Sequence, residues 1–349
     1  MRFGVKDFAF AEGDPCVVIA EIGVNHNGNP DIAKQLIDVA IHAKVDIVKF
    51  QVFKSEKEIS RYAPKAPYQE ETTSSEGGQL EMCKALELSC DVLKDMQKYC
   101  TKRSIGFLCT PFEWDSVDLL VDELEAETIK IPSGEITNLP FLEHIGSKCK
   151  AVVLSTGAST LAETGLAVET LQKAGCEELL LLHCVTSYPA KIADANLRVM
   201  KTMREAFCFP VGFSDHTLGI NVPIAAAALG ASAIEKHFTL DRNMPGPDHR
   251  ASVEPDELAT MVLGIHEAHL ALGSTVKQPQ PCELPNLNLV RKSLVASRAL
   301  KAGERLTRDT IEIKRPALGI QPADLAKVMG MTLTADIKED TPIRWEDLR

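Results

Sequence analysis

The sequence predicts a (β/α)₈ barrel followed by a small additional domain. Eight short, continuous apolar runs alternate with amphipathic stretches, which is the pattern of parallel strands covered by helices. None of these runs is followed by a GxGxxG or GxxxxGK[ST] motif, so a doubly wound nucleotide-binding sheet is the less favoured alternative. The chain has 349 residues, more than one compact core usually holds, and its pattern changes near the end.

The strands and helices of the barrel follow in regular order. The expected strands cover residues 16–23, 46–53, 105–112, 127–134, 151–157, 178–189, 210–215 and 232–240. The clearest helices between them cover residues 31–44, 91–103, 221–230 and 256–273. One connection, residues 54–87, is polar, contains prolines and glycines, and is too long for an ordinary barrel loop. Because long barrel loops are usually functional, we expect it to form a lid or a substrate wall.

The barrel domain is predicted to cover residues 1–273. Residues 274–289 contain Pro279, Pro281 and Pro285 and are typical of a semi-extended linker. Residues 290–349 consist of short apolar segments separated by turn signals. A domain of this size buries little core, so we expect it to dock on another surface.

The composition of the chain limits the cellular location and the binding partners that we expect for the protein. A formal net charge of −11 argues against nucleic acid or anionic membranes as partners, since both need a basic surface. The ten cysteines include no CxxC pair, which favours free thiols in a reducing compartment over a disulfide framework. No signal peptide is recognisable, and no segment approaches the ~20 apolar residues needed to span a bilayer. We therefore expect a cytoplasmic protein.

Polar or ionisable residues stand at the end of every predicted strand. Barrels of this class build their chemistry at the C-terminal ends of the strands, and core packing does not require polar groups there. The ring is therefore predicted to line an active site and comprises Glu21, Asn25, Lys49, Gln51, Thr110, Lys130, Ser133, Glu135, Ser155, Thr186, Tyr188, Ser214, His216, Glu235 and His237.

His216 and His237 follow consecutive strands, so they should be neighbours at the rim. A metal site with two protein ligands leaves positions open for water and substrate and suits an ion that polarises a carbonyl. Single histidines are more often structural, and His26, His183 and His249 compete as ligands. Strand alternation places Glu235 on the same face as His237, where we expect it to orient that imidazole.

Lys49 and Lys130 lie within strands, where an unpaired buried cation is costly. They are tolerable if they project into the mouth and meet an anion. With serines nearby, they would form a cradle for phosphate or carboxylate. A Schiff-base lysine is the alternative.

Seven motifs and the C-terminal segment together resemble the sialic acid synthases. The motifs are AEIGVNHNG (20–28), KFQ (49–51), IPSGE (131–135), STG (155–157), GFSDHT (212–217), IEKHFTLD (234–241) and GPDHRAS (246–252). Residues 291–320 resemble the antifreeze-like (SAF) domain appended to those enzymes. The resemblance implies a (β/α)₈ TIM barrel with a C-terminal β-rich SAF domain, in a domain-swapped homodimer.

For activity, the resemblance implies condensation of phosphoenolpyruvate with N-acetylmannosamine and water, giving a nine-carbon 2-keto acid and phosphate. It implies a divalent ion, Mn²⁺ first and Mg²⁺ or Co²⁺ as alternatives, on His216 and His237. Phosphoenolpyruvate would be held by Lys49, Thr110, Lys130, Ser133, Ser155, Thr186 and Ser214. The sugar would contact Gln51, Tyr188, Asp248 and, from the partner's SAF domain, Arg315.

Two carboxylates are the predicted catalytic residues. Glu135 is the candidate general base, because a carboxylate beside the enol carbon can deprotonate the incoming water. Glu21 would lie with the sugar-side or metal-water contacts. Thr72 stands where many relatives carry asparagine, and Thr186 where they carry serine or asparagine, and these are two departures of this sequence from the family pattern.

Three other functions remain open at this point. A legionaminic acid synthase would use 2,4-diacetamido-2,4,6-trideoxymannose, and the Thr72 position keeps this alternative open. A metal-dependent aldolase belongs to a different reaction class and would not need the SAF domain. A non-enzymatic ice- or carbohydrate-binding protein is disfavoured by the polar ring at the strand ends.

Overall fold

The protein is described from a computed structural model that covers residues 1–4, 6–11, 13–73 and 77–349. The chain divides after Gly273 into two compact units, residues 1–273 and 274–349. This is the residue at which the sequence predicts the barrel to end. Part of the predicted long loop, residues 74–76, lies outside the described residues.

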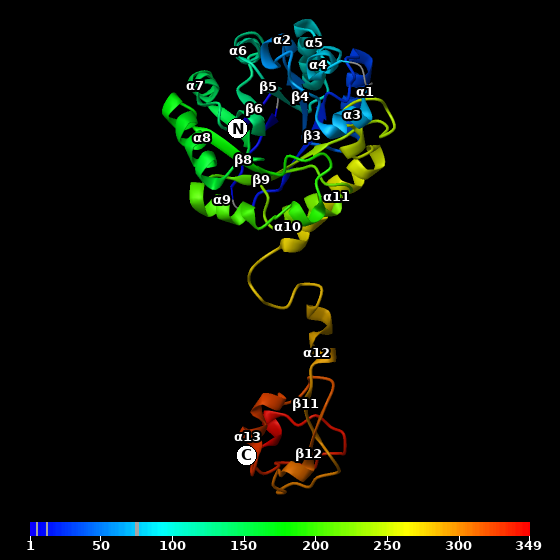
Figure 1. Cartoon of the computed structure of the whole chain (residues 1–349). Coiled ribbons are helices and arrows are strands. Elements are labelled where there is room, and N and C mark those ends of the chain that lie inside the picture. Colours follow the sequence, from blue (N-terminus) through cyan, green and yellow to red (C-terminus); the bar gives the residue numbers. More distant parts are fainter. Residues whose placement is uncertain (5, 12, 74–76) are drawn as a thin grey trace. The chain divides into compact units, whose positions relative to one another are not determined.

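The first unit is the predicted barrel of eight parallel strands (Figure 1). The hydrogen-bonded order is β5-β4-β3-β10-β9-β8-β7-β6, and the terminal strands β5 and β6 contact each other, which closes the ring. The strands are β3 (Val17–Gly23), β4 (Ile47–Val52), β5 (Gly106–Pro111), β6 (Thr128–Ile131), β7 (Ala151–Ser155), β8 (Glu178–Cys184), β9 (Val211–Asp215) and β10 (Ala233–His237).

Helices surround the strands on the outside (Figure 1). They are α1 (Pro30–His42), α5 (Cys90–Lys102), α6 (Trp114–Asp118), α7 (Leu139–Lys148), α8 (Leu161–Ala174), α9 (Val199–Phe207), α10 (Asn221–Ala228) and α11 (Pro255–Leu272). The long β4–α5 connection is not structureless, because it contains three short helices, α2 (Ser55–Glu58), α3 (Pro67–Thr72) and α4 (Gln79–Lys84).

Two apolar layers hold the barrel together. The larger one lies between the strands and the helices. The smaller one fills the barrel interior with residues such as Ile19, Ile47 and Val153, and Phe3 of the N-terminal hairpin β1 (Arg2–Phe3) and β2 (Lys6–Asp7) packs against them. Since alternate strand residues face the same side, the next inward positions above this layer carry polar side chains. The barrel interior therefore changes from apolar to polar along the strands.

Several strands end earlier than the sequence predicts: the segment predicted as 232–240 forms a strand only to His237, and the one predicted as 151–157 only to Ser155. The segment predicted as 127–134 forms a strand only to Ile131, because Pro132 has no N–H to continue the ladder. The next residues, Ser133–Glu135, form a 3₁₀ turn. The segment predicted as 178–189 forms a strand only to Cys184, so its last residues belong to a loop.

The second unit has its own small core. The segment predicted as a linker contains the short helix α12 (Leu287–Val290). The antiparallel strands β11 (Ser293–Ala296) and β12 (Ile311–Lys314) follow, and then α13 (Leu325–Val328). Its core contains Leu294, Leu306, Val328 and Leu333.

Two further features concern the thiol state of the cysteines and the hydropathy of the helices. All ten cysteines are free, as predicted. Among the described residues, no helix is both long and apolar enough to cross a membrane.

A fully buried ion pair joins β9 and β10 on their outer side. Lys236 Nζ lies 2.6 Å from Asp215 Oδ2, and neither side chain is exposed. The second carboxylate oxygen, Oδ1, accepts a hydrogen bond from the Thr217 N–H at 2.9 Å. Because His216 and His237 are the next residues along these strands, this pair fixes the relative position of both histidines.

We predict that Lys236→Met lowers the free energy of unfolding by about 3–5 kcal/mol, because it leaves the Asp215 carboxylate buried without a countercharge. The double variant Asp215→Asn/Lys236→Met should lose much less, since asparagine still accepts from Thr217 and buries no charge. Urea unfolding followed by circular dichroism measures both. Equal losses in the single and double variants would contradict this assignment.

Candidate active site

A cavity of about 270 Å³ opens at the C-terminal ends of the barrel strands. Fourteen of the predicted residues line it, which means that the ring predicted from the strand ends converges on one space. They are Glu21, Lys49, Gln51, Thr110, Lys130, Ser133, Ser155, Thr186, Tyr188, Ser214, His216, Glu235, His237 and Asp248.

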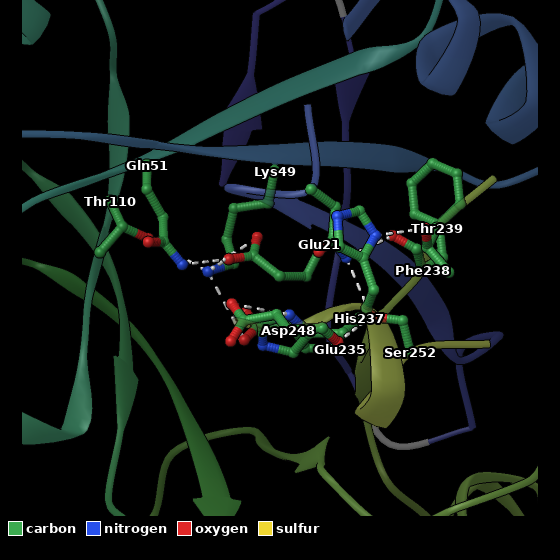
Figure 2. Close-up of polar contacts among 12 residues, drawn as sticks. Glu21, Lys49, Gln51, Thr110, Glu235, His237, Phe238, Thr239, Asp248 and Ser252 are labelled. Atoms are coloured by element: carbon green, nitrogen blue, oxygen red, sulfur yellow. Dashed lines mark hydrogen bonds and ion pairs between the residues drawn. The ribbon is translucent and has the colours of Figure 1, made fainter. Parts of the chain in front are cut away.

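The floor of the cavity is a network of opposite charges (Figure 2). Lys49 Nζ lies 3.1 Å from Glu21 Oε2 and 3.6 Å from Glu235 Oε1. Lys130 Nζ donates to Glu235 Oε2 at 2.8 Å. All four side chains are at most 5% exposed. The two lysines are therefore paired with carboxylates, whereas the sequence predicts only an anionic substrate as their partner.

Neutral side chains complete the hydrogen bonds of this network. Lys49 donates to Thr110 Oγ1 at 3.1 Å, and Ser214 Oγ donates to Glu235 Oε1 at 3.0 Å. Gln51 Nε2 donates to Glu21 Oε1 at 2.8 Å. These contacts place the side chains of five neighbouring strands in one layer.

Burial and charge act in opposite directions on the pKa values of the network. Burial alone would raise the pKa of Glu235, but the adjacent Lys130 and Lys49 ammonium groups hold it well below its usual range. The pKa of Glu21 is raised, because burial outweighs the attraction of Lys49. The pKa of Lys130 is lowered, since burial outweighs the attraction of Glu235. Glu235 is thus the permanent anion of the floor.

The predicted role of Glu235 differs from its observed contacts. Its two carboxylate oxygens are occupied by Lys130 and Ser214, so it does not orient the His237 ring through a hydrogen bond. The carboxylate that faces His237 Nδ1 belongs instead to Asp248, at 3.8 Å. Alternation along β10 correctly predicts that Glu235 faces inward but does not identify the partner that it meets.

His216 and His237 lie side by side at the rim, with ring centroids 5.4 Å apart. His216 Nδ1 donates to the Val185 carbonyl at 2.8 Å, which leaves its Nε2 as the ring atom with a free lone pair. His237 Nδ1 is buried and has no hydrogen-bond partner. Burial and the neighbouring His216 hold the pKa of His237 well below its ordinary value, so this imidazole is neutral.

A divalent ion fits these two histidines on chemical grounds. The His237 imidazole is neutral and has a buried nitrogen without a partner, so it can donate a lone pair to a metal. The Val185 carbonyl fixes the tautomer of the His216 ring. No group of three or more His, Cys, Asp or Glu side chains arranged for a metal occurs among the described residues. The pair would therefore hold an ion with most of its coordination positions open.

The competing histidines are held by structural hydrogen bonds. His183 Nε2 donates to the Ala195 carbonyl at 2.8 Å, as expected of a core histidine. His249 pairs with Thr239 Oγ1 at 2.7 Å, and His26 Nδ1 accepts from the Gly28 N–H at 3.0 Å. None of the three lines the cavity.

The loops after β6, β7 and β8 pack tightly to form a hydroxyl-rich side of the cavity. The Gly157 N–H donates to Ser133 Oγ at 2.9 Å. A Cβ at Gly157 would lie 2.1 Å from Thr186 Oγ1, so only glycine allows this approach. Ser155 Oγ is buried without a partner and faces the same cavity. A bound anion would supply the missing acceptor.

The β4–α5 connection covers part of the cavity, as the sequence predicts. It supplies side chains that the sequence analysis did not single out, namely Glu58, Tyr68, Gln69, Met82, Cys83 and Leu86. The Tyr68 ring stacks on Tyr188 with centroids 5.4 Å apart. Thr72, the residue singled out in this loop, does not line the cavity, and its hydroxyl donates to the Tyr68 carbonyl at 2.9 Å. The Thr72 carbonyl accepts from the Gly246 N–H at 3.3 Å, so Thr72 supports the wall through backbone contacts rather than by facing the cavity.

Three predicted residues do not line the cavity, namely Asn25, Glu135 and Arg315. Asn25 Nδ2 donates to the Phe238 carbonyl and to Ser252 Oγ, each at 2.9 Å. Glu135 ends the turn whose Ser133 and Gly134 line the cavity, but its own side chain does not. The Glu135 carboxylate accepts from Asn138 Nδ2 at 2.6 Å. Arg315 is exposed and belongs to the second unit. Its role at a partner's sugar site, and the domain-swapped dimer itself, stay predictions.

Comparison with known families assigns both units. The profile of the NeuB family matches residues 36–277, and that of the SAF domain matches residues 291–349. A crystal structure of N-acetylneuraminic acid (sialic acid) synthetase from Leptospira borgpetersenii, in complex with citrate, superposes with a TM-score of 0.70 at 34% identity. The match covers 78% of this chain and 90% of that one.

Curated relatives extend over nearly the whole chain. The N,N'-diacetyllegionaminic acid synthase of Campylobacter jejuni is 46% identical, over 94% of this chain and 98% of its own length. The protein of the same name from Legionella pneumophila is 40% identical, over 95% and 94%. The N-acetylneuraminate-9-phosphate synthase of Mus musculus is 36% identical, over 96% and 93%.

Proposed function

The chain belongs to the NeuB family, and from that membership we propose that it condenses phosphoenolpyruvate with 2,4-diacetamido-2,4,6-trideoxymannose. It is an enzyme of the sugar-acid synthase type. The products would be N,N'-diacetyllegionaminic acid and phosphate, with water consumed. One observation carries the proposal: a hydroxyl- and lysine-lined anion pocket lies directly beside two neighbouring histidines in a single cavity.

The proposed sugar is the one that the sequence motifs rank second. Those motifs alone favour N-acetylmannosamine over the diacetamido sugar. The two relatives with higher identity carry the legionaminic acid name, and the relative with lower identity carries the neuraminate name. This ranking supports the diacetamido sugar as substrate.

Phosphoenolpyruvate would occupy the side of the cavity formed by β6, β7 and β9. Lys130, Ser133 and Ser155 supply one cation and two hydroxyls there, and charge-assisted hydrogen bonds to phosphate or carboxylate are among the stronger polar contacts. Ser155 Oγ, buried without a partner, would gain one. Lys49, which lines the same cavity from β4, would add attraction.

The aldehyde of the open-chain sugar would lie at His216 and His237. A divalent ion held by these two imidazoles, Mn²⁺ in our proposal, would supply Lewis-acid polarisation of that aldehyde oxygen. The His216 ring is held in place by the Val185 carbonyl. The Tyr188 ring packs against it with centroids 4.1 Å apart and restricts its rotation.

The reaction forms one bond between C3 of phosphoenolpyruvate and C1 of the sugar. Positive charge then develops at C2 of the former phosphoenolpyruvate, water adds there, and the adduct collapses by breaking the C2–O bond to phosphate. The water must lose a proton to a carboxylate. Glu21 and Glu235 are engaged with lysines, whereas the Glu135 carboxylate accepts from the neutral Asn138 amide. Glu135 therefore stays our proposed base, reached by rotation of its side chain.

The first test measures phosphate release from phosphoenolpyruvate with three sugars: the diacetamido sugar, N-acetylmannosamine and N-acetylmannosamine 6-phosphate. We expect release with the diacetamido sugar, loss of release with a chelator, and recovery with Mn²⁺. Release that needs no metal, or no release with any of the three sugars, would refute the proposal.

His216→Ala should abolish metal-dependent turnover and weaken Mn²⁺ binding by at least about tenfold, with the fold unchanged. Titration calorimetry and circular dichroism measure the two properties. His42→Ala, an exposed histidine on α1, is the matched control and should bind Mn²⁺ like the wild type. Unchanged Mn²⁺ affinity in His216→Ala would exclude it as a ligand.

Glu135→Gln should lower kcat by at least about 100-fold, the usual contribution of general base catalysis, while phosphoenolpyruvate and Mn²⁺ still bind. Rapid-quench kinetics and binding titrations separate the two effects. Glu143→Gln, exposed on α7, serves as the control. Near-normal turnover of Glu135→Gln would remove Glu135 from this role.

A further inference from the structure

One side of the cavity is apolar, although the rest of its surface is rich in charges and hydroxyls. We call this side the apolar wall. It lies at the ends of β3, β4 and β5 and under the segment that contains α4, and it consists of Val24, Phe53, Met82, Cys83, Leu86 and Phe112.

The apolar wall is a packed unit with a defined surface. Val24, Phe53 and Leu86 are buried and form a cluster of their own, against which Cys83 and Phe112 pack. The rings of Phe53 and Phe112 meet edge to face, with centroids 6.0 Å apart. Met82 and Cys83 are only partly buried. An apolar surface that is backed by packed side chains and faces a cavity is suited to bind an apolar part of a ligand.

Phosphoenolpyruvate cannot account for this wall. Its phosphate and carboxylate are charged, and its CH₂ carbon is the reacting atom, so it has no spare apolar group to bury. The groups that suit its charges, Lys130, Ser133 and Ser155, come from β6 and β7 and the turn between them. The wall comes from β3, β4, β5 and the α4 segment. It therefore faces the second substrate.

We infer that the apolar wall binds the methyl groups of the sugar, at C6 and on the 4-acetamido group, and so selects a 6-deoxy diacetamido sugar over a fully hydroxylated one. The inference rests on the proposed function and adds the residues that determine specificity. N-acetylmannosamine would place hydroxyl groups against Phe53, Met82 and Phe112, which offer no hydrogen-bond partner. Buried hydroxyls without partners weaken binding.

Polar side chains beside the wall suit the amide parts of the same sugar. Gln51 and Gln69 line the cavity next to it, with Tyr68 from α3. Gln69 Oε1 accepts from the Ala66 N–H at 2.9 Å, which orients the side chain. Among the residues that the structure describes, its Nε2 makes one long contact, of 3.4 Å, to the Tyr68 hydroxyl. This amide therefore retains donor capacity for an acetamido carbonyl.

Met82 is the residue to test, because it is partly exposed to the cavity and lies on a short surface helix. Met82→Gln keeps length and helix propensity but makes the wall polar, whereas Met82→Leu keeps it apolar. The measurement is kcat/KM for the diacetamido sugar and for N-acetylmannosamine, with the KM for phosphoenolpyruvate as a check on the rest of the site.

The wild type should prefer the diacetamido sugar by about 10- to 100-fold, the range that apolar pockets achieve. In Met82→Gln this preference should fall about tenfold, mainly through KM of the diacetamido sugar, while Met82→Leu keeps it. A preference for N-acetylmannosamine, an equal preference in both variants, or an equal loss with both sugars would overturn the inference and leave the proposed function standing. Absence of turnover with either sugar would overturn both.

Discussion

The site depends on one constraint: two lysines must be kept charged inside a closed barrel. Burial penalises Lys49 and Lys130, and the structure offsets that penalty with Glu21 and Glu235 rather than with solvent. Every polar contact of the floor follows from this arrangement, since Gln51, Thr110 and Ser214 fill the remaining hydrogen bonds. In the proposed reaction, an anionic substrate would share these two lysines with the carboxylates, and the hydroxyls of Ser133 and Ser155 would supply further contacts.

Strand register explains how residues far apart in the chain meet in this floor. Glu21 pairs with His237 across β3 and β10, and with Lys49 across β3 and β4. The positions below them, such as Ile19 and Ile47, belong to the apolar interior. A slip of one residue in any strand would exchange inward and outward faces. The buried pair Asp215–Lys236 opposes such a slip where the two histidines stand.

The sequence predicts the barrel and the identity of most cavity residues, because period-two alternation and chain order determine both. It does not predict contacts between side chains of different strands. Glu235 was assigned to His237, yet Lys130 and Ser214 hold it. The β4–α5 loop was recognised by its length, but nothing in its polar composition indicates that Met82 faces inward. Which loop residues line the cavity depends on packing between α3, α4 and the barrel, which no local pattern encodes.

The division of the cavity into a charged floor and an apolar wall has a consequence for the reaction. In the proposed reaction, lysines and histidines would act on the reacting ends of both substrates, where charge changes most, and contacts there must suit the transition state. In the proposed binding mode, Phe53, Met82 and Phe112 would touch no reacting atom, so their binding energy would be available to hold the sugar aldehyde next to the enol carbon. Because these contacts come from loops and the floor from strands, the wall can change with the sugar while the floor, and hence the chemistry, stays the same.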